Sequence, residues 1–177
     1  LFKKFKIKCT ELKKVKLNKI MNIKVNRKQI GSDRISNSIA VVSKKRNFII
    51  VDFGTATTFD VIIKNNYIGG IIAPGVNLSL STLIRKASLI PVLSLKKINK
   101  VIGKNTVSAV RAGFFWGYIG LFNNIIKLIK KETKKSFKII ITGGFSKIFV
   151  KSFGKNIIID KDITIKGLIK TSKLINF

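Results

Sequence analysis

Three strand-like segments follow one another between residues 47 and 73, with almost no chain between them. They are NFIIVDF (47–53), TTFDVII (57–63) and YIGGIIA (67–73), and all are rich in β-branched or aromatic residues. The links GTA and KNN are short, whereas a crossover between parallel strands needs about a dozen residues or more. We therefore predict an antiparallel meander of three strands.

Two long helices are predicted after the meander. Pro74-Gly75 opens a helix that ends near Ser88, and a second helix runs from Asn105-Thr106 to about Lys131. Spacings of three and four residues predict the buried stripe of the second helix: Val110, Phe114, Gly117, Leu121, Ile125 and Leu128.

The last part of the chain adds two strands and two helices. KIIIT (138–142) and NIIID (156–160) are strand-like, with a short helix predicted between them. A terminal helix carries Ile165, Leu168 and Ile169. From residue 47 the order is βββαβαβα, the α/β order of a ribonuclease-H-like half-domain, two of which build the actin/sugar-kinase (ASKHA) architecture. We assign residues 47–177 to the second of two such halves.

Residues 1–46 then form the tail of a largely missing first half plus a connecting helix. Apolar and basic residues alternate in residues 1–25, which predicts strands. GSDRISNSIAVVSK (31–44) predicts a helix that Ser32 or Asp33 caps. The apolar residues on one face of this helix are Ile35, Ile39 and Val42.

The formal net charge of +29 raises the question of a nucleic-acid or anionic-membrane partner. Only five of the 36 basic residues are Arg, and Lys, Ile and Asn, which share A/T-rich codons, are all heavily used. The Lys residues are also spread along the whole chain rather than clustered. We therefore favour codon bias as the cause and do not favour nucleic acid as the partner, although the positive field would attract anionic small molecules such as ATP.

The sequence has no His and one Cys, Cys9. A general base must therefore be a carboxylate, a Lys, a Tyr or Cys9. A single Cys forms no intrachain disulfide, which fits a reducing cytoplasm. The most apolar stretch, residues 112–122, is too short to span a bilayer, so we expect no membrane partner.

The segment VDFGTATTFD (51–60) lies at the first turn of the meander. Gly54 would let the backbone approach a ligand, and Thr55 and Thr57 offer hydroxyls near turn amides that can donate to phosphate. The alternative is an ordinary hairpin, with Thr chosen for β propensity and Asp60 on an exposed strand face. Asp52 favours a site, because an acid in an apolar strand needs a cation or a full set of donors.

The segment GSDR (31–34) places two charged residues at a helix start. In the functional interpretation, Asp33 accepts a proton from an alcohol and Arg34 holds an anionic group of the same substrate. In the alternative, Asp33 is a plain helix cap.

Two further motifs are ordinary when taken alone. Asn105-Thr106 is typical of a helix cap, and Gly143-Gly144 is typical of a turn, although it would also let a base or ribose lie against the backbone. Cys9 and Trp116 are interpreted as core or interface residues.

The ordered set of motifs resembles the type III pantothenate kinases over about residues 25–170. The matching segments are GSDR (31–34), VDFGTATTFD (51–60), GGIIAPG (69–75), GKNT (103–106), AGFFWGYIG (112–120) and ITGG (141–144). Such enzymes transfer the γ-phosphoryl group of ATP to pantothenate, giving 4'-phosphopantothenate in the first step of coenzyme A synthesis. The resemblance implies a cytoplasmic homodimer that uses ATP with a divalent cation, expected to be Mg²⁺, and a monovalent cation, K⁺ or NH₄⁺.

The resemblance also implies roles for individual residues. Asp33 would be the proton acceptor and Asp52 the ligand of the monovalent cation. The implied pantothenate contacts are Gly31, Ser32, Asp33, Arg34 and Thr106. The implied ATP contacts are Gly54, Thr55, Thr57, Gly143 and Gly144.

One family motif is missing from the sequence. The family carries an Asp-x-Gly-Asn-Thr phosphate loop on the first hairpin of its first half, and nothing here matches it. The chain is then either N-terminally incomplete or a degraded paralogue, and the intact later motifs favour the former. We expect these 177 residues to have no kinase activity by themselves.

Two other functional classes remain as alternatives. A Baf-type transcriptional regulator of the same fold would bind ligand without catalysis, and the intact Asp33-Arg34 pair argues for the enzyme instead. A basic nucleic-acid-binding module is the second alternative.

Overall fold

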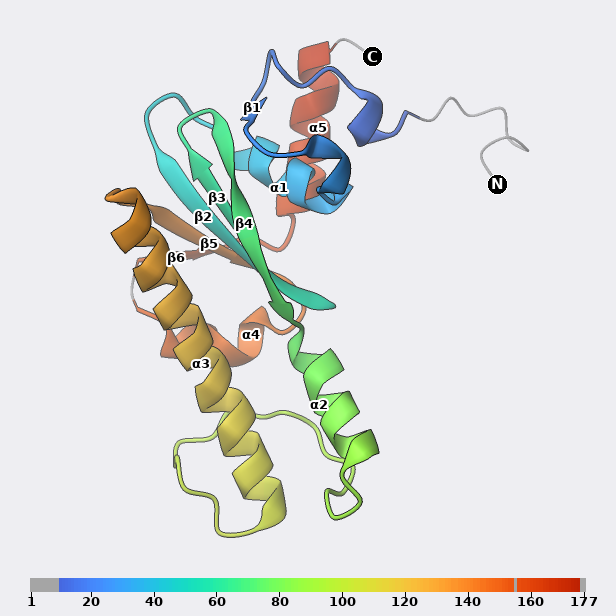
Figure 1. Ribbon diagram of the computed structural model, residues 1–177, viewed down its shortest axis with the longest axis vertical. Helices are drawn as coiled ribbons and strands as arrows, with labels where there is room; N and C mark the ends of the chain where they lie inside the picture. Colours follow the sequence, from blue (N-terminus) through green and yellow to red (C-terminus); the bar gives the residue numbers. More distant parts are fainter. Residues whose placement is uncertain (1–9, 155, 176–177) are drawn as a thin grey trace, which may run out of the picture. The chain divides into compact units, whose positions relative to one another are not determined.

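The computed structural model describes residues 10–154 and 156–175 (Figure 1). The strand prediction for residues 1–9 and the assignment of Cys9 lie outside the described residues. The strands are β1 (Asn22–Ile23), β2 (Asn47–Phe53), β3 (Ala56–Ile63), β4 (Asn66–Pro74), β5 (Lys138–Thr142) and β6 (Ile157–Ile159). The α-helices are α1 (Ser32–Val41), α2 (Val76–Lys86), α3 (Thr106–Thr133), α4 (Ser146–Phe149) and α5 (Ile163–Ile175).

The predicted meander is present. The links between its strands are Gly54–Thr55 and Lys64–Asn65, and links of two residues join antiparallel neighbours. The six strands form one sheet in the order β1-β4-β3-β2-β5-β6, with parallel pairing of β1 with β4 and of β5 with β6. This mixed α/β sheet confirms the ribonuclease-H-like order, with α2 and α3 together in the first helical position.

The chain forms two compact units, each built from segments that are distant in sequence. The first unit contains the described residues up to Phe48, then Asp60–Gly69, then the described residues from Asp162 onward. The second unit contains Ile49–Phe59 and the described residues of Gly70–Lys161. Strands β3 and β4 therefore contribute residues to both units.

Helices α1 and α5 lie side by side in the first unit (Figure 1). Gly167 permits the contact, because a Cβ atom there would lie 1.9 Å from the backbone oxygen of Ser36. The Ser36 hydroxyl donates to the Thr164 carbonyl at 2.6 Å, and the Thr164 hydroxyl donates to Asn37 Oδ1 at 2.6 Å. Ser36, Asn37 and Ser38 are all buried. Small and polar side chains thus take part in the contact between the two helices.

The strand prediction for the part of residues 1–25 that the structure describes is largely wrong. The segment Leu12–Lys14 is a 3₁₀ helix, and only Asn22–Ile23 pairs as a strand. The Arg27 guanidinium donates to the carbonyls of Leu12 and Val15. These carbonyls are therefore satisfied by a side chain and not by a neighbouring strand.

Helix α1 begins differently from the prediction. Its N-cap is Gly31, which makes no side-chain capping hydrogen bond, and Asp33 lies in the first turn. Ser32 and Asp33 are therefore not caps. Ile35 and Ile39 are fully buried, as their spacing predicts.

The buried stripe predicted for α3 is wrong by about one position. The buried residues are Ala112, Phe115, Tyr118, Ile119, Phe122, Ile126 and Ile129. Phe122 stacks on Phe153 with ring centroids 3.9 Å apart, and Phe53 stacks on Phe149 at 5.3 Å. Val110, Phe114, Gly117 and Leu121 instead line an open groove of about 440 Å³. Apolar residues surround this part of the helix, so the periodicity left two neighbouring faces almost equivalent. No helix within residues 10–154 and 156–175 has the length and apolar character needed to cross a membrane.

Candidate functional site

The turn between β2 and β3 is held tightly in the second unit. The Gly54 amide donates to the Ala56 carbonyl at 3.1 Å, and Thr55 is exposed at the tip. Gly75 closes on this turn, since a Cβ atom there would lie 2.0 Å from the Thr55 carbonyl oxygen. The segment GGIIAPG thus supports the turn through its last glycine.

Gly143, which follows β5, approaches the end of β2. Its φ of 91° lies in the left-handed region that favours glycine. A Cβ atom there would lie 2.5 Å from both Asp52 Oδ1 and the Phe53 carbonyl carbon. The half-buried Asp52 carboxylate therefore lies against the glycine turn.

A pocket of about 350 Å³ opens beside this turn. Its lining residues are Phe53, Gly54, Thr55, Asn77, Leu78, Ser81, Gly144 and Phe145. It brings three residues of the predicted ATP set, Gly54, Thr55 and Gly144, to one place. No sequence motif indicated Asn77 and Ser81. Their spacing of four residues near the start of α2 is the signal that could have indicated them.

Thr57 and Thr106 lie outside the pocket lining, as do Asp52 and Gly143. Thr57 is fully buried in β3, and its hydroxyl has no hydrogen-bond partner among the described residues. Thr106 is exposed as the first residue of α3. Asn105 is the cap: its Oδ1 accepts from the Ser108 amide at 2.9 Å, and the Ser108 hydroxyl accepts from the Asn105 amide at 3.1 Å.

The GSDR segment lies in the first unit. Asp33 is exposed in the first turn of α1, where the helix N-terminus favours negative charge. A Cβ atom on Gly31 would lie 2.3 Å from Asp33 Oδ1. Gly31 therefore leaves room for the Asp33 carboxylate in its present position.

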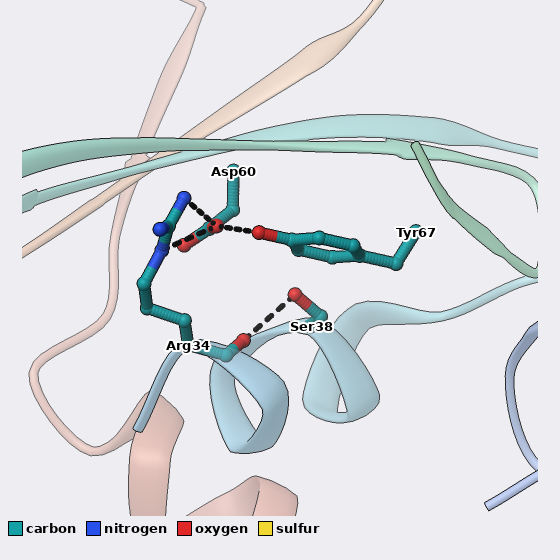
Figure 2. A network of polar contacts seen from close by, with 4 residues as sticks. All are labelled: Arg34, Ser38, Asp60 and Tyr67. Atoms are coloured by element: carbon teal, nitrogen blue, oxygen red, sulfur yellow. Dashed lines mark hydrogen bonds and ion pairs between the residues drawn. The ribbon is translucent and has the colours of Figure 1, made fainter. Parts of the chain in front are cut away.

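Arg34 enters a polar network with Asp60 and Tyr67 (Figure 2). Arg34 Nε donates to Asp60 Oδ1 at 2.8 Å, and Arg34 Nη2 lies 2.7 Å from the same oxygen. The Tyr67 hydroxyl also donates to Asp60 Oδ1, at 2.6 Å, and the Ser38 hydroxyl donates to the Arg34 carbonyl at 2.8 Å.

The alternative in which Asp60 lies on an exposed strand face is wrong, because the side chain is fully buried. Residues Phe59 to Ile62 of β3 are all buried, so both faces of the strand are covered at this point. Asp60 is therefore more deeply buried than Asp52, and its need for a counter-charge is the greater. Its counter-charge comes from Arg34.

The network shifts the protonation of its members. Burial raises the pKa of Asp60 above its usual range, although Arg34 and Tyr67 both act in the opposite direction. Burial and the Asp60 carboxylate together raise the pKa of Tyr67. Burial alone would lower the pKa of Arg34, but Asp60 outweighs it and raises that pKa. Arg34 is thus a permanent cation and Tyr67 a permanent donor.

This network gives a test by alkaline titration. The difference in tyrosinate absorbance between the protein and its Tyr67→Phe variant reports Tyr67 alone. We expect no signal near pH 10, where exposed tyrosines titrate, because the folded-state pKa is raised. The stability that neutral Tyr67 provides is fully present below pH ~10 and is lost as pH rises further. A midpoint near 10 in a chain still folded by circular dichroism would contradict the buried hydrogen bond.

Comparison with known proteins identifies the family. The family model of the type III pantothenate kinases matches residues 1–128. A type III pantothenate kinase from Pelagibacter ubique is 67% identical over 175 residues, which are 98% of this chain. Those from Cereibacter sphaeroides and Paramagnetospirillum magneticum are 43% and 40% identical over 79% and 80% of it. The chain belongs to the type III pantothenate kinase family.

The chain spans 71% of the length of the Pelagibacter type III pantothenate kinase and 55% of the lengths of the other two. The predicted resemblance is confirmed, and so is the choice of a kinase family. Within the described residues, no group of three or more Cys, Asp or Glu side chains is placed to hold a metal ion.

Solved structures support the fold. A protein from Campylobacter jejuni named for the Baf family of transcriptional activators has a TM-score of 0.63 and 23% identity, over 90% of this chain and 72% of its own. The Alp12 filament structure has a TM-score of 0.52 and 20% identity, over 81% and 53%. At such identities the likeness concerns the fold alone.

Proposed function

We propose that the protein of which this chain is a part transfers the γ-phosphoryl group of ATP to pantothenate, giving 4'-phosphopantothenate for coenzyme A synthesis. The observation that carries the proposal is the arrangement of GSDR in a chain of this family. Asp33 is exposed at a helix N-terminus, and Arg34 beside it is a cation fixed by a buried carboxylate. A base and an anion-binding group thus adjoin on one helix turn.

In the proposed reaction, the alcohol oxygen of pantothenate attacks the γ-phosphorus, and the bond from that phosphorus to the bridging oxygen of ADP breaks. Asp33, an exposed carboxylate in a sequence without His, accepts the proton of the alcohol. Arg34 binds the carboxylate of pantothenate, and Gly31, Ser32 and Thr106 complete the contacts. Phosphoryl transfer depends mainly on positioning and on neutralising charge, so this set suffices chemically.

The second unit would bind the nucleotide. Gly54, Thr55, Gly143 and Gly144 offer backbone amides or hydroxyls to phosphate and ribose, and three of the four line the pocket. We add Asn77 and Ser81, whose polar side chains also line it. A contact between Thr57 and ATP stays a prediction.

Asp52 would hold the monovalent cation, K⁺ or NH₄⁺. Oxygen donors suit such a hard cation, and the Asp52 carboxylate lies against the Gly143 turn, where carbonyl groups are close by. A bound cation would neutralise charge on the nucleotide phosphates. Mg²⁺ would be bound mainly through those phosphates.

The test uses the full-length protein. We expect ADP to form only when pantothenate is present, and turnover to fall several-fold when K⁺ is replaced by Na⁺. Asp52→Asn should remove this dependence on K⁺ while the protein stays folded. A protein that forms no pantothenate-dependent ADP in K⁺ buffer would contradict the proposed function. An Asp52→Asn variant that keeps its K⁺ response would contradict only the cation assignment.

A cytoplasmic homodimer completes the proposal. Its support is the family membership and the open apolar groove between α2 and α3, since large exposed apolar patches commonly mark interfaces. Light scattering of the full-length protein would measure the subunit number.

A further inference from the structure

We propose that Asp60 and Tyr67 are positioning residues, which fix the Arg34 guanidinium in the orientation that binds the carboxylate of the substrate. The inference rests on the proposed function. It assigns a role to the least explained acid of the VDFGTATTFD segment and to a tyrosine that no motif indicated.

Three groups converge on one oxygen: two hydrogen-bond donors, Arg34 Nε and the Tyr67 hydroxyl, and Arg34 Nη2, which makes an ion pair there without a hydrogen bond. Arg34 Nε, Arg34 Nη2 and the Tyr67 hydroxyl all lie within 2.8 Å of Asp60 Oδ1. Nε and Nη2 form one edge of the guanidinium, so its third nitrogen, Nη1, points away from Asp60. Because the guanidinium of arginine is planar and carries donors on more than one edge, it can contact Asp60 along one edge and bind an anion along another.

The three side chains come from different elements, which fixes the group in space. Asp60 belongs to β3, Tyr67 to β4 and Arg34 to α1, as Figure 2 shows. Asp60 is fully buried and Tyr67 is 2% exposed, so both side chains are enclosed by protein. The Arg34 side chain retains 12% exposure. A long arginine side chain would otherwise lose much rotamer freedom when substrate binds, and the network removes that freedom beforehand.

The alternative is that the network only stabilises the fold. A buried ion pair is weak support for that role, because apolar residues of similar volume usually stabilise as well or better. Arg34 also adjoins the exposed Asp33 at the first turn of α1 and is not part of a wholly apolar core. Its position therefore favours a role in binding.

A double-mutant cycle separates the two roles. The four full-length proteins are the wild type, Asp60→Asn, Arg34→Gln and the double variant. We expect Asp60→Asn to raise the KM for pantothenate by about 10- to 100-fold and the KM for ATP by less than about 3-fold. Tyr67→Phe, which keeps the ion pair, should raise the KM for pantothenate less. In the Arg34→Gln background, Asp60→Asn should add less than about 2-fold, because its target is gone.

The outcomes are distinguishable. If Asp60→Asn is folded by circular dichroism and keeps its KM for pantothenate, the inference is overturned. It is also overturned if the increases in the KM for pantothenate of the two single variants multiply in the double variant. The same holds if the KM for pantothenate and the KM for ATP rise together, since a purely structural role predicts these results. If Asp60→Asn fails to fold, the double variant, which contains no unpaired buried charge, allows the comparison with Arg34→Gln. A wild type without pantothenate-dependent turnover overturns the proposed function itself.

Discussion

Asp33→Asn in the full-length protein is expected to lower kcat by about 10²- to 10⁴-fold, the usual contribution of a general base. The substitution keeps the size of the side chain but removes its capacity to accept the proton of the alcohol. Binding of ATP should be nearly unchanged, because the nucleotide contacts proposed above belong to the second unit. Kinetics at saturating pantothenate and ATP measures kcat. Calorimetric titration with ATP measures the dissociation constant of ATP.

Glu132→Gln is the matched control for this variant. Glu132 is an exposed acid near the end of α3, so its replacement makes the same change in net charge away from GSDR. We expect wild-type kcat from this control. An Asp33→Asn protein with near wild-type turnover would show that another group accepts the proton.

Gly143→Ala is expected to destabilise the second unit strongly, because this position combines a positive φ with a close approach to the backbone of β2. Alanine at a positive φ costs roughly 1–2 kcal/mol. The new methyl would also meet Asp52 Oδ1 and the Phe53 backbone at about 2.5 Å. Because backbone atoms cannot move aside as a side-chain end can, we expect a lower melting temperature and ATP affinity reduced by at least about tenfold. Thermal unfolding and calorimetry measure the two effects.

Gly144→Ala provides the control for stability. This neighbouring glycine has no atom within 4 Å of an added Cβ atom, and its φ is not positive. Its melting temperature should stay close to that of the wild type. Equal destabilisation by both substitutions would contradict the close approach of Gly143 to β2.

The order of the elements could be predicted because each strand or helix has a clear local period. The meander follows from three apolar runs with short links. The face that α3 buries could not be predicted in the same way. Phe114 and Phe115 are neighbours of equal hydrophobicity, and only packing against Phe149 selects Phe115.

In the candidate site, too, the local motifs could be predicted and the long-range contacts could not. GSDR and VDFG were recognisable as ordered motifs, and the structure brings Asp52, Gly54 and Gly143 together. The pairing of Arg34 with Asp60 joins residues 26 positions apart, and no local pattern reports such a contact. The burial of Asp60 was not predictable, because strand alternation assumes one solvated side, whereas β3 is covered on both.

The contact between α1 and α5 has a consequence for how the protein is synthesised. Ser36 and Thr164 are 128 positions apart, whereas Arg34 and Asp60 are separated by 26. At typical rates of translation, roughly ten seconds pass before the partner of Ser36 leaves the ribosome. The arginine can pair with its carboxylate early in this interval. The helix that carries Asp33 acquires α5 as its neighbour only after Thr164 has been made. A nascent chain interrupted in between would hold Arg34 in place on a helix that still lacks its contact with α5.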